Sequence, residues 1–122
     1  MNIGIHTIDY KHFRKLAVNP RFRSKLLTSR EMKFLMGKGF STRIIAEMFC
    51  VKNAFIKAMG GAVSGCRMDE ISVLQDWSGL AYIAAQGMTK TRLDAKKCKI
   101  TCSFSHNNRT ATAVVVLYPA NM

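Results

Sequence analysis

The sequence predicts an α+β fold with a mostly antiparallel sheet packed on one long helix. Three features carry this prediction: a β-branched run at residues 2–9, a long amphipathic segment at residues 43–59, and two β-rich runs at residues 99–104 and 110–117. Strands that flank a group of helices in this order are typical of the α+β class. The length of 122 residues predicts a single domain over residues 1–122.

The segments between the first strand and the long helix carry helix start and stop signals. Residues 10–18 have apolar side chains at helical spacing, and Asn19-Pro20 ends that helix. Thr28 and Glu31 match a capping box, in which a hydroxyl and a carboxylate each bond a free N–H at a helix start. This pattern predicts a short helix that ends near residue 36.

The long helix should begin after a cap at Ser41 or Thr42 and end at Gly60-Gly61. Beyond it the hydrophobic period changes to that of strands, with a hairpin of residues 71–75 and 80–84 around a turn at 76–79. The pattern of residues 88–97 predicts a short basic helix. The two β-rich runs near the C-terminus complete the sheet.

The charge predicts an anionic partner. Lys and Arg number 19 against 7 acidic residues, a net charge of +12, of which +9 lies in residues 1–60. Such an excess suits nucleic acid, a polyphosphate ligand or an acidic protein, and composition does not separate the three. Nucleic acid is the weakest of these readings, because no aromatic and basic RNA motif or DNA-reading helix accompanies the charge.

The cysteines and the hydropathy pattern indicate a cytoplasmic protein. None of the four cysteines forms a C-x-x-C pair, so we expect reduced thiols, and Cys98 with Cys102 makes only a weak case for a structural metal. The N-terminus has no continuous apolar segment of the kind found in signal peptides. No run of about 18 apolar residues occurs, so we expect no membrane partner.

Four segments resemble bacterial holo-acyl-carrier-protein synthases, the small phosphopantetheinyl transferases. Each matches a motif of that family, and they follow one another in the family's order. They are GIHTID at residues 4–9 (G-[IL]-D-[IL]-x-[ED]), RFRSKLLTSRE at 21–31 (R-F-x-x-R-[IL]-[LF]-T-x-x-E), FCVKNAFIKAMG at 49–60 (F-A-[AV]-K-E-A-x-x-K-A-x-G) and CSFSH at 102–106 (V-[ST]-[IL]-[ST]-H). P-loop, dinucleotide-binding, hydrolase-elbow and zincin motifs are absent from the sequence.

The resemblance implies a phosphopantetheinyl transferase fold, a homotrimer, and coenzyme A bound in clefts between subunits. The implied reaction moves phosphopantetheine from coenzyme A to a serine of an acidic acyl carrier protein. The implied catalytic residues are Lys57, beside the carrier serine, and His6. The implied cofactor-binding residues are Lys52, Asn53, Gly60, Ser105 and His106. The implied carrier-binding residues are Lys11, His12, Arg14, Arg21 and Phe22, although the bases among them are equally expected on any solvated helix face.

The departures from the family concern the metal. Its members hold Mg²⁺ with an Asp and a Glu, and these positions are His6 and Asn53 in this chain. Because Mg²⁺ favours carboxylate and phosphate oxygens, we expect weaker binding, and His6 suits Mn²⁺ or Zn²⁺ better. Lys57, Lys52 and an imidazolium at His6 can offset part of the phosphate charge instead.

Two functions therefore stay open from the sequence. One is a divergent transferase with altered metal dependence. The other is a non-catalytic or repurposed homologue that binds a carrier protein or a coenzyme A derivative in the same cleft. Structural roles stand beside the functional ones: His6 as a hydrogen-bonded histidine at a strand end, and Lys57 as a charge that complements the end of a helix.

Overall fold

The computed structural model describes residues 1–121, and its elements follow the predicted order closely. In chain order they are β1 (Asn2–Asp9), α1 (Tyr10–Ala17), α2 (Pro20–Leu26), α3 (Ser29–Met36), α4 (Thr42–Ala58), the 3₁₀ turns η1 (Gly61–Ser64) and η2 (Met68–Glu70), β2 (Ile71–Gln75), β3 (Ala81–Ala85), α5 (Gly87–Ala95), β4 (Cys98–His106) and β5 (Thr110–Pro119). Helix α2 and the two 3₁₀ turns are the elements that the sequence left unassigned. Helix α2 forms because Asn19 caps it and Pro20 fits its first turn.

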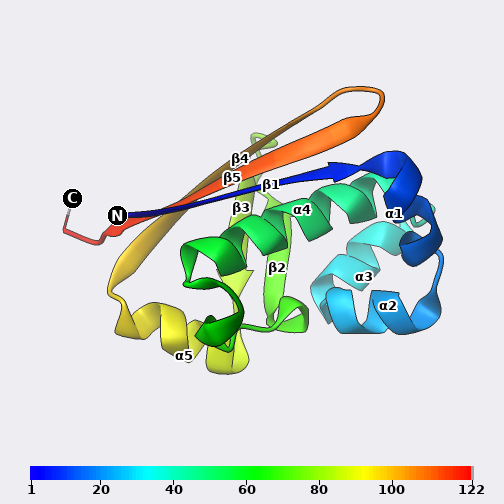
Figure 1. The fold of residues 1–122 in the computed structure, drawn as a ribbon. Helices are drawn as coiled ribbons and strands as arrows, with labels where there is room; N and C mark the ends of the chain where they lie inside the picture. The colour runs from blue at the N-terminus through cyan, green and yellow to red at the C-terminus, as the bar shows by residue number, and fades with distance from the viewer. Residues whose placement is uncertain (122) are drawn as a thin grey trace.

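A three-stranded antiparallel sheet in the order β1-β5-β4 forms one layer, and α4 runs beneath it (Figure 1). Alternate residues of the central strand face the helix and are buried, namely Ala111, Ala113, Val115 and Leu117. Helices α1–α3 gather at one end of α4, and α5 lies near the other end (Figure 1). The predicted α+β architecture is confirmed.

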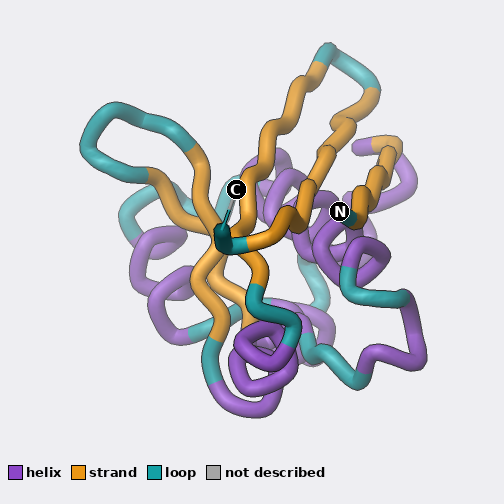
Figure 2. The backbone as a smooth tube through the Cα atoms, turned by 90° about the vertical axis from the view of Figure 1, so that its left-hand side faces the viewer, coloured by secondary structure: helices purple, strands orange, loops and turns teal. Residues whose placement is uncertain are grey.

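The hairpin of β2 and β3 makes a second, two-stranded sheet instead of joining the first. Its tie to the larger sheet is a side-chain contact, in which the Cys102 thiol of β4 donates to the Ala81 carbonyl of β3 at 3.5 Å. Figure 2 shows two hairpin loops, in teal, that extend outward from the helices. A pocket of about 540 Å³ opens between α4 and this hairpin.

Strand β1 approaches α4 so closely that only glycine fits at the contact. A Cβ atom on Gly4 would lie 1.8 Å from the Ala54 carbonyl oxygen and 2.8 Å from the Ala58 nitrogen. Gly4, His6 and Ile8 form the inward row of β1, whereas Ile3 and Ile5 point outward and are 58% and 54% exposed. Gly4 therefore sets the distance at which His6 meets the helix.

Local side-chain caps fix the helices that follow β1. Asp9 accepts from the Lys11 N–H at 2.8 Å and starts α1, and Asn19 accepts from the Arg21 N–H at 2.9 Å and starts α2. The capping box at Thr28 and Glu31 is present as predicted, and Ser41 caps α4. Among residues 1–121, no helix combines the length and the apolar character needed to cross a membrane.

Candidate functional site

Lys57 and His6 meet where the last turn of α4 passes under β1. The Lys57 ammonium donates to the Ile5 carbonyl at 3.0 Å and lies 3.0 Å from His6 Nδ1, which accepts a hydrogen bond when the ring is neutral. Burial, and then the charge of Lys57, lower the pKa of His6 below its usual value. The imidazolium expected at His6 is therefore disfavoured, and Lys57 carries the positive charge.

Aromatic rings support His6 from below. Its ring lies edge-on to Phe49 with centroids 6.0 Å apart, and Phe49 packs on Phe13 and Phe22 at 5.1 and 5.7 Å. Phe22, expected on the carrier-binding surface, is half-buried in this cluster. It thus links α2 to the helix that carries the site.

Asn53 lies between Phe49 and Lys57 on the same face of α4, because the three residues are spaced by one helical turn. Its side-chain Nδ2 donates to the Phe49 carbonyl at 3.0 Å. Gly60 follows three residues after Lys57, with a left-handed φ of +118° and open space around its Cα. It ends α4 and leaves the backbone beside Lys57 uncovered.

Lys52 does not face this site. Its side chain is fully buried, and its ammonium lies 2.5 Å from Glu31 Oε1 while also donating to the carbonyls of Leu26 and Met68. Burial lowers its pKa and the nearby Glu31 raises it, the first effect being larger. The expected contact of Lys52 with a cofactor is not what this geometry provides, because three protein oxygens already surround the ammonium.

The buried pair holds several segments together. Glu31 Oε1 also accepts from the Thr28 N–H at 3.0 Å, and its Oε2 accepts from the Val73 N–H at 2.9 Å. The Thr28 and Ser72 hydroxyls are 2.8 Å apart. Lys52 therefore joins α4 to α3, to β2 and to the segment that follows Gly60.

Ser105 and His106 lie at the far end of the molecule from Lys57. They end β4, and His106 Nε2 is 2.9 Å from the guanidinium of Arg43, in the first turn of α4. Arg43 and Lys57 are 14 residues apart on one helix, which separates them by about 21 Å. A single chain thus brings His6, Asn53, Lys57 and Gly60 together and leaves Ser105 and His106 elsewhere.

The predicted carrier-binding bases form an exposed surface. Lys11, His12 and Arg14 project from α1, and Arg21 projects from the start of α2. Their exposure fits contact with an acidic partner, as expected from the local charge.

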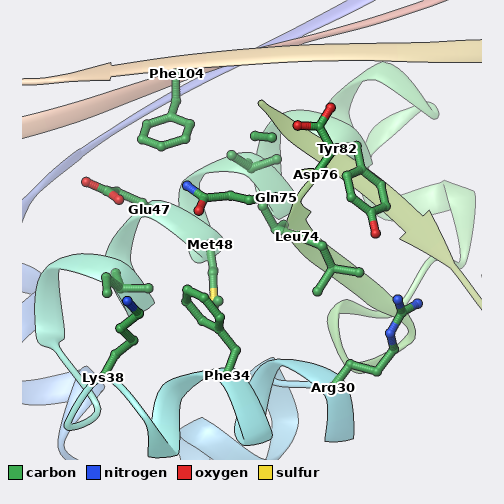
Figure 3. A pocket seen from close by; sticks show the side chains of 14 residues that line it. Arg30, Phe34, Lys38, Glu47, Met48, Leu74, Gln75, Asp76, Tyr82 and Phe104 are labelled. Carbon is green, nitrogen blue, oxygen red and sulfur yellow. The ribbon is translucent and has the colours of Figure 1, made fainter. Parts of the chain in front are cut away.

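Two pockets lie on either side of α4's first turns. The larger, of about 540 Å³, opens between α3, α4 and the β2–β3 hairpin, and Figure 3 shows Phe34 and Met48 inside it with Arg30 and Lys38 near its edge. Phe104 and Tyr82 add aromatic walls (Figure 3). The smaller, of about 260 Å³, is polar and includes Arg14 and Arg43. Apolar walls suit a ligand with a planar ring, and Glu47 and Asp76 in the same lining match the two cations.

Comparison with known proteins indicates the same family as the sequence motifs. The sequence profile of the 4′-phosphopantetheinyl transferase superfamily matches residues 3–115. The chain belongs to this superfamily. Similar proteins include holo-[acyl-carrier-protein] synthases from Alkaliphilus metalliredigens, 33% identical over 93% of this chain and 95% of the relative, and from Geobacter sulfurreducens, 32% identical over 93% and 94%. The chain is a transferase of the holo-acyl-carrier-protein synthase type.

Solved structures share the fold of this transferase. A holo-(acyl-carrier-protein) synthase from Bacillus anthracis str. Ames, determined in complex with CoA (3′,5′-ADP), is 25% identical and superposes with a TM-score of 0.79 over 97% of this chain and 96% of its own. The synthase from Neisseria meningitidis has a TM-score of 0.88 at 23% identity over 96% and 97%. The predicted phosphopantetheinyl transferase fold is confirmed.

Sequence reasoning about this transferase missed two features. The capping box identified Glu31 but not its pairing with Lys52, since the two are 21 residues apart and meet only in the folded chain. The larger pocket was also missed, because its walls come from five elements and carry no shared motif. The sequence showed Arg30 and Lys38 as part of the positive net charge but did not indicate that they line a pocket.

Proposed function

We propose that this transferase moves the phosphopantetheine arm of coenzyme A onto a serine of an acyl carrier protein and releases adenosine 3′,5′-bisphosphate. The observation that carries the proposal is the Lys57 ammonium, held by β1 at the end of α4 within the motif that the family shares. The relatives named as holo-acyl-carrier-protein synthases, and one structure determined with CoA, support the assignment.

The proposed chemistry is a displacement at phosphorus. The serine Oγ bonds to the phosphorus that carries the pantetheine arm, the bond from that phosphorus to the adenosine bisphosphate oxygen breaks, and the hydroxyl proton passes to the departing bisphosphate, directly or through water. Lys57 stabilises the negative charge on the phosphate oxygens by donating hydrogen bonds. His6 and the Ile5 carbonyl orient the Lys57 ammonium.

Coenzyme A binds, in this proposal, in clefts between the subunits of a homotrimer. One chain separates Lys57 and Gly60 from Ser105 and His106 by about the length of α4, roughly 21 Å, so a complete site needs residues from two copies. The outward face of β1, with Ile3 and Ile5 more than half exposed, offers apolar surface for such contact. Light scattering of the purified protein should give about three times 13.7 kDa, and a monomer would contradict this assembly.

The carrier protein docks on the exposed bases of α1 and α2. Lys11, His12, Arg14 and Arg21 face solvent on adjoining helices, and an acidic carrier supplies the opposite charge. The four free cysteines fit a reducing compartment, which supports a cytoplasmic location for the reaction.

The metal site of this chain differs from the family pattern. His6 and Asn53 offer a neutral imidazole and a carboxamide where the family pattern has two carboxylates, and the His6 lone pair at Nδ1 faces the Lys57 ammonium. Such a donor set does not fit a hard divalent cation. The second candidate function, a non-catalytic homologue that binds carrier protein or coenzyme A, draws its support from the same two residues.

One experiment separates the two functions. The full chain is incubated with coenzyme A and an apo carrier protein in Mg²⁺, in Mn²⁺ and in EDTA, and the carrier is weighed by mass spectrometry. A phosphopantetheine mass increase that disappears when the carrier serine is changed to Ala supports the transferase. No increase under any of the three conditions, together with retained coenzyme A binding, supports the binding protein.

A further inference from the structure

Each carboxylate of this transferase has a protein partner other than His6 or Asn53. The sequence has seven Asp and Glu residues, and every one of them has a hydrogen-bond or ion-pair partner elsewhere in the described chain. The partners are the Lys11 N–H for Asp9, Lys52 for Glu31, Arg43 for Glu47, Arg67 for Asp69, Thr89 for Glu70, Ser78 for Asp76 and Lys90 for Asp94.

His6 and Asn53 provide a neutral donor set beside Lys57. Among residues 1–121, no group of three or more His, Cys, Asp or Glu side chains lies close enough to hold a metal ion. A dication at His6 Nδ1 would have to displace the Lys57 ammonium, which lies 3.0 Å from that nitrogen. A dication at Nε2 would place the ring proton on Nδ1, where it faces the ammonium. Two like charges competing for one lone pair repel each other, so the ammonium and the metal exclude one another.

Lys57 is itself placed as a fixed cation. Its ammonium is anchored by the Ile5 carbonyl at 3.0 Å and by His6, and the aromatic packing under His6 holds that ring in position. A lysine ammonium is a compact point charge with three donors, so hydrogen atoms not directed at Ile5 and His6 can reach phosphate oxygens. The open backbone at Gly60 leaves that side accessible.

We propose that the Lys57 ammonium takes the place of a divalent metal ion in this transferase, so that coenzyme A binding and arm transfer proceed without a divalent cation at His6 and Asn53. The inference rests on the proposed function for the transfer step, but its binding part stands apart from catalysis. His6 is then a positioning residue that orients Lys57. Asn53 is a neutral replacement, so no carboxylate at that position pairs with the Lys57 ammonium.

The first test measures Mn²⁺ binding to the full chain by the loss of the free-ion electron paramagnetic resonance signal. The wild type is expected to leave the signal at the level of a protein-free control. The double variant His6→Asp with Asn53→Glu is expected to bind one equivalent, because it restores two hard ligands. Saturable binding of one Mn²⁺ by the wild type that is lost in His6→Ala would overturn the proposal.

The second test measures coenzyme A binding by calorimetry in EDTA and in Mg²⁺. The wild-type affinity is expected to be the same in both, whereas that of the double variant should tighten in Mg²⁺. In EDTA, Lys57→Ala is expected to weaken binding about 10-fold to 100-fold, the usual loss for a hydrogen bond to a charged group. The matched control Lys33→Ala removes an exposed charge from α3 and should leave the affinity unchanged.

The outcomes also separate this inference from the proposed function. Arm transfer in EDTA at the rate seen in Mg²⁺ supports both. Transfer that stops in EDTA and returns with Mg²⁺ supports the proposed function and overturns the role of Lys57 as the cation. No transfer in either condition overturns the proposed function, and the two binding tests then decide the inference by themselves. Equal coenzyme A affinities for Lys57→Ala and Lys33→Ala count against it.

Discussion

The contact of Gly4 with α4 leads to a sharp prediction for the substitution Gly4→Ala. The added Cβ would lie 1.8 Å from the Ala54 carbonyl oxygen, whereas ordinary contact begins at 3.4 Å, so β1 must retreat by about 1.6 Å. The obstacle is backbone in the middle of a helix, which no side-chain rotation relieves. Overpacking a core typically costs about 1–3 kcal/mol, and we expect the upper end or beyond for a clash of this depth.

A matched control is available at Gly37, which follows α3. A Cβ on Gly37 meets the Phe34 carbonyl oxygen at an ordinary 3.6 Å, and its φ of −77° suits any residue. Gly37→Ala is expected to be neutral or to stabilise the protein by about 0.4–1 kcal/mol, because it restricts the unfolded chain.

Urea unfolding of both variants gives the comparison. The midpoint of Gly4→Ala should fall with an unchanged slope, while that of Gly37→Ala stays the same or rises. Because His6 lies two residues beyond Gly4, the retreat of β1 should also weaken the hydrogen bond between Lys57 and His6 and reduce coenzyme A affinity. Equal stabilities for the two variants would refute the close approach of β1 to α4.

Three further predictions test other contacts. Lys52→Met should lower the free energy of unfolding by about 3–5 kcal/mol, because it leaves the buried Glu31 carboxylate without its partner. The control Lys90→Met, in an exposed ion pair, should lower it by less than about 1 kcal/mol. Urea unfolding measures both. Folding lowers the pKa of His6, so the unfolded chain binds the proton at a higher pH and the stability should decline as pH falls below about 6.5. An NMR titration in which Lys57→Ala leaves the His6 pKa unchanged would contradict the contact between His6 and Lys57. Ile5→Lys should disperse the proposed trimer, and light scattering that still gives the wild-type mass would refute the role of β1's outer face.

Local chemistry made most of the fold predictable. The caps at Thr28, Glu31 and Ser41 act on backbone groups three residues away, so the sequence alone shows where α3 and α4 begin. The glycine pair at residues 60–61 likewise shows where α4 ends. The cap at Asn19 acts over the same short range, so the start of α2 is also encoded locally.

The candidate site was predictable in part. The four-residue spacing of Phe49, Asn53 and Lys57 placed them on one helix face, and the family motif paired that face with His6 of the first strand. Spacing could not show that Lys52, one position before Asn53, turns the opposite way into the core. That direction depends on Glu31 and on the Leu26 and Met68 carbonyls, which reach Lys52 only through tertiary packing.

The sequence by itself determined the family, the order of the elements and the excess of positive charge. The tertiary structure decided that Lys57 carries the charge next to His6, that Lys52 is a buried structural ion, and that Ser105 and His106 lie at the other end of α4. The physical reason is range. Caps, turns and motif spacing depend on neighbours along the chain, whereas a side chain's charge state and accessibility depend on groups that only folding brings near.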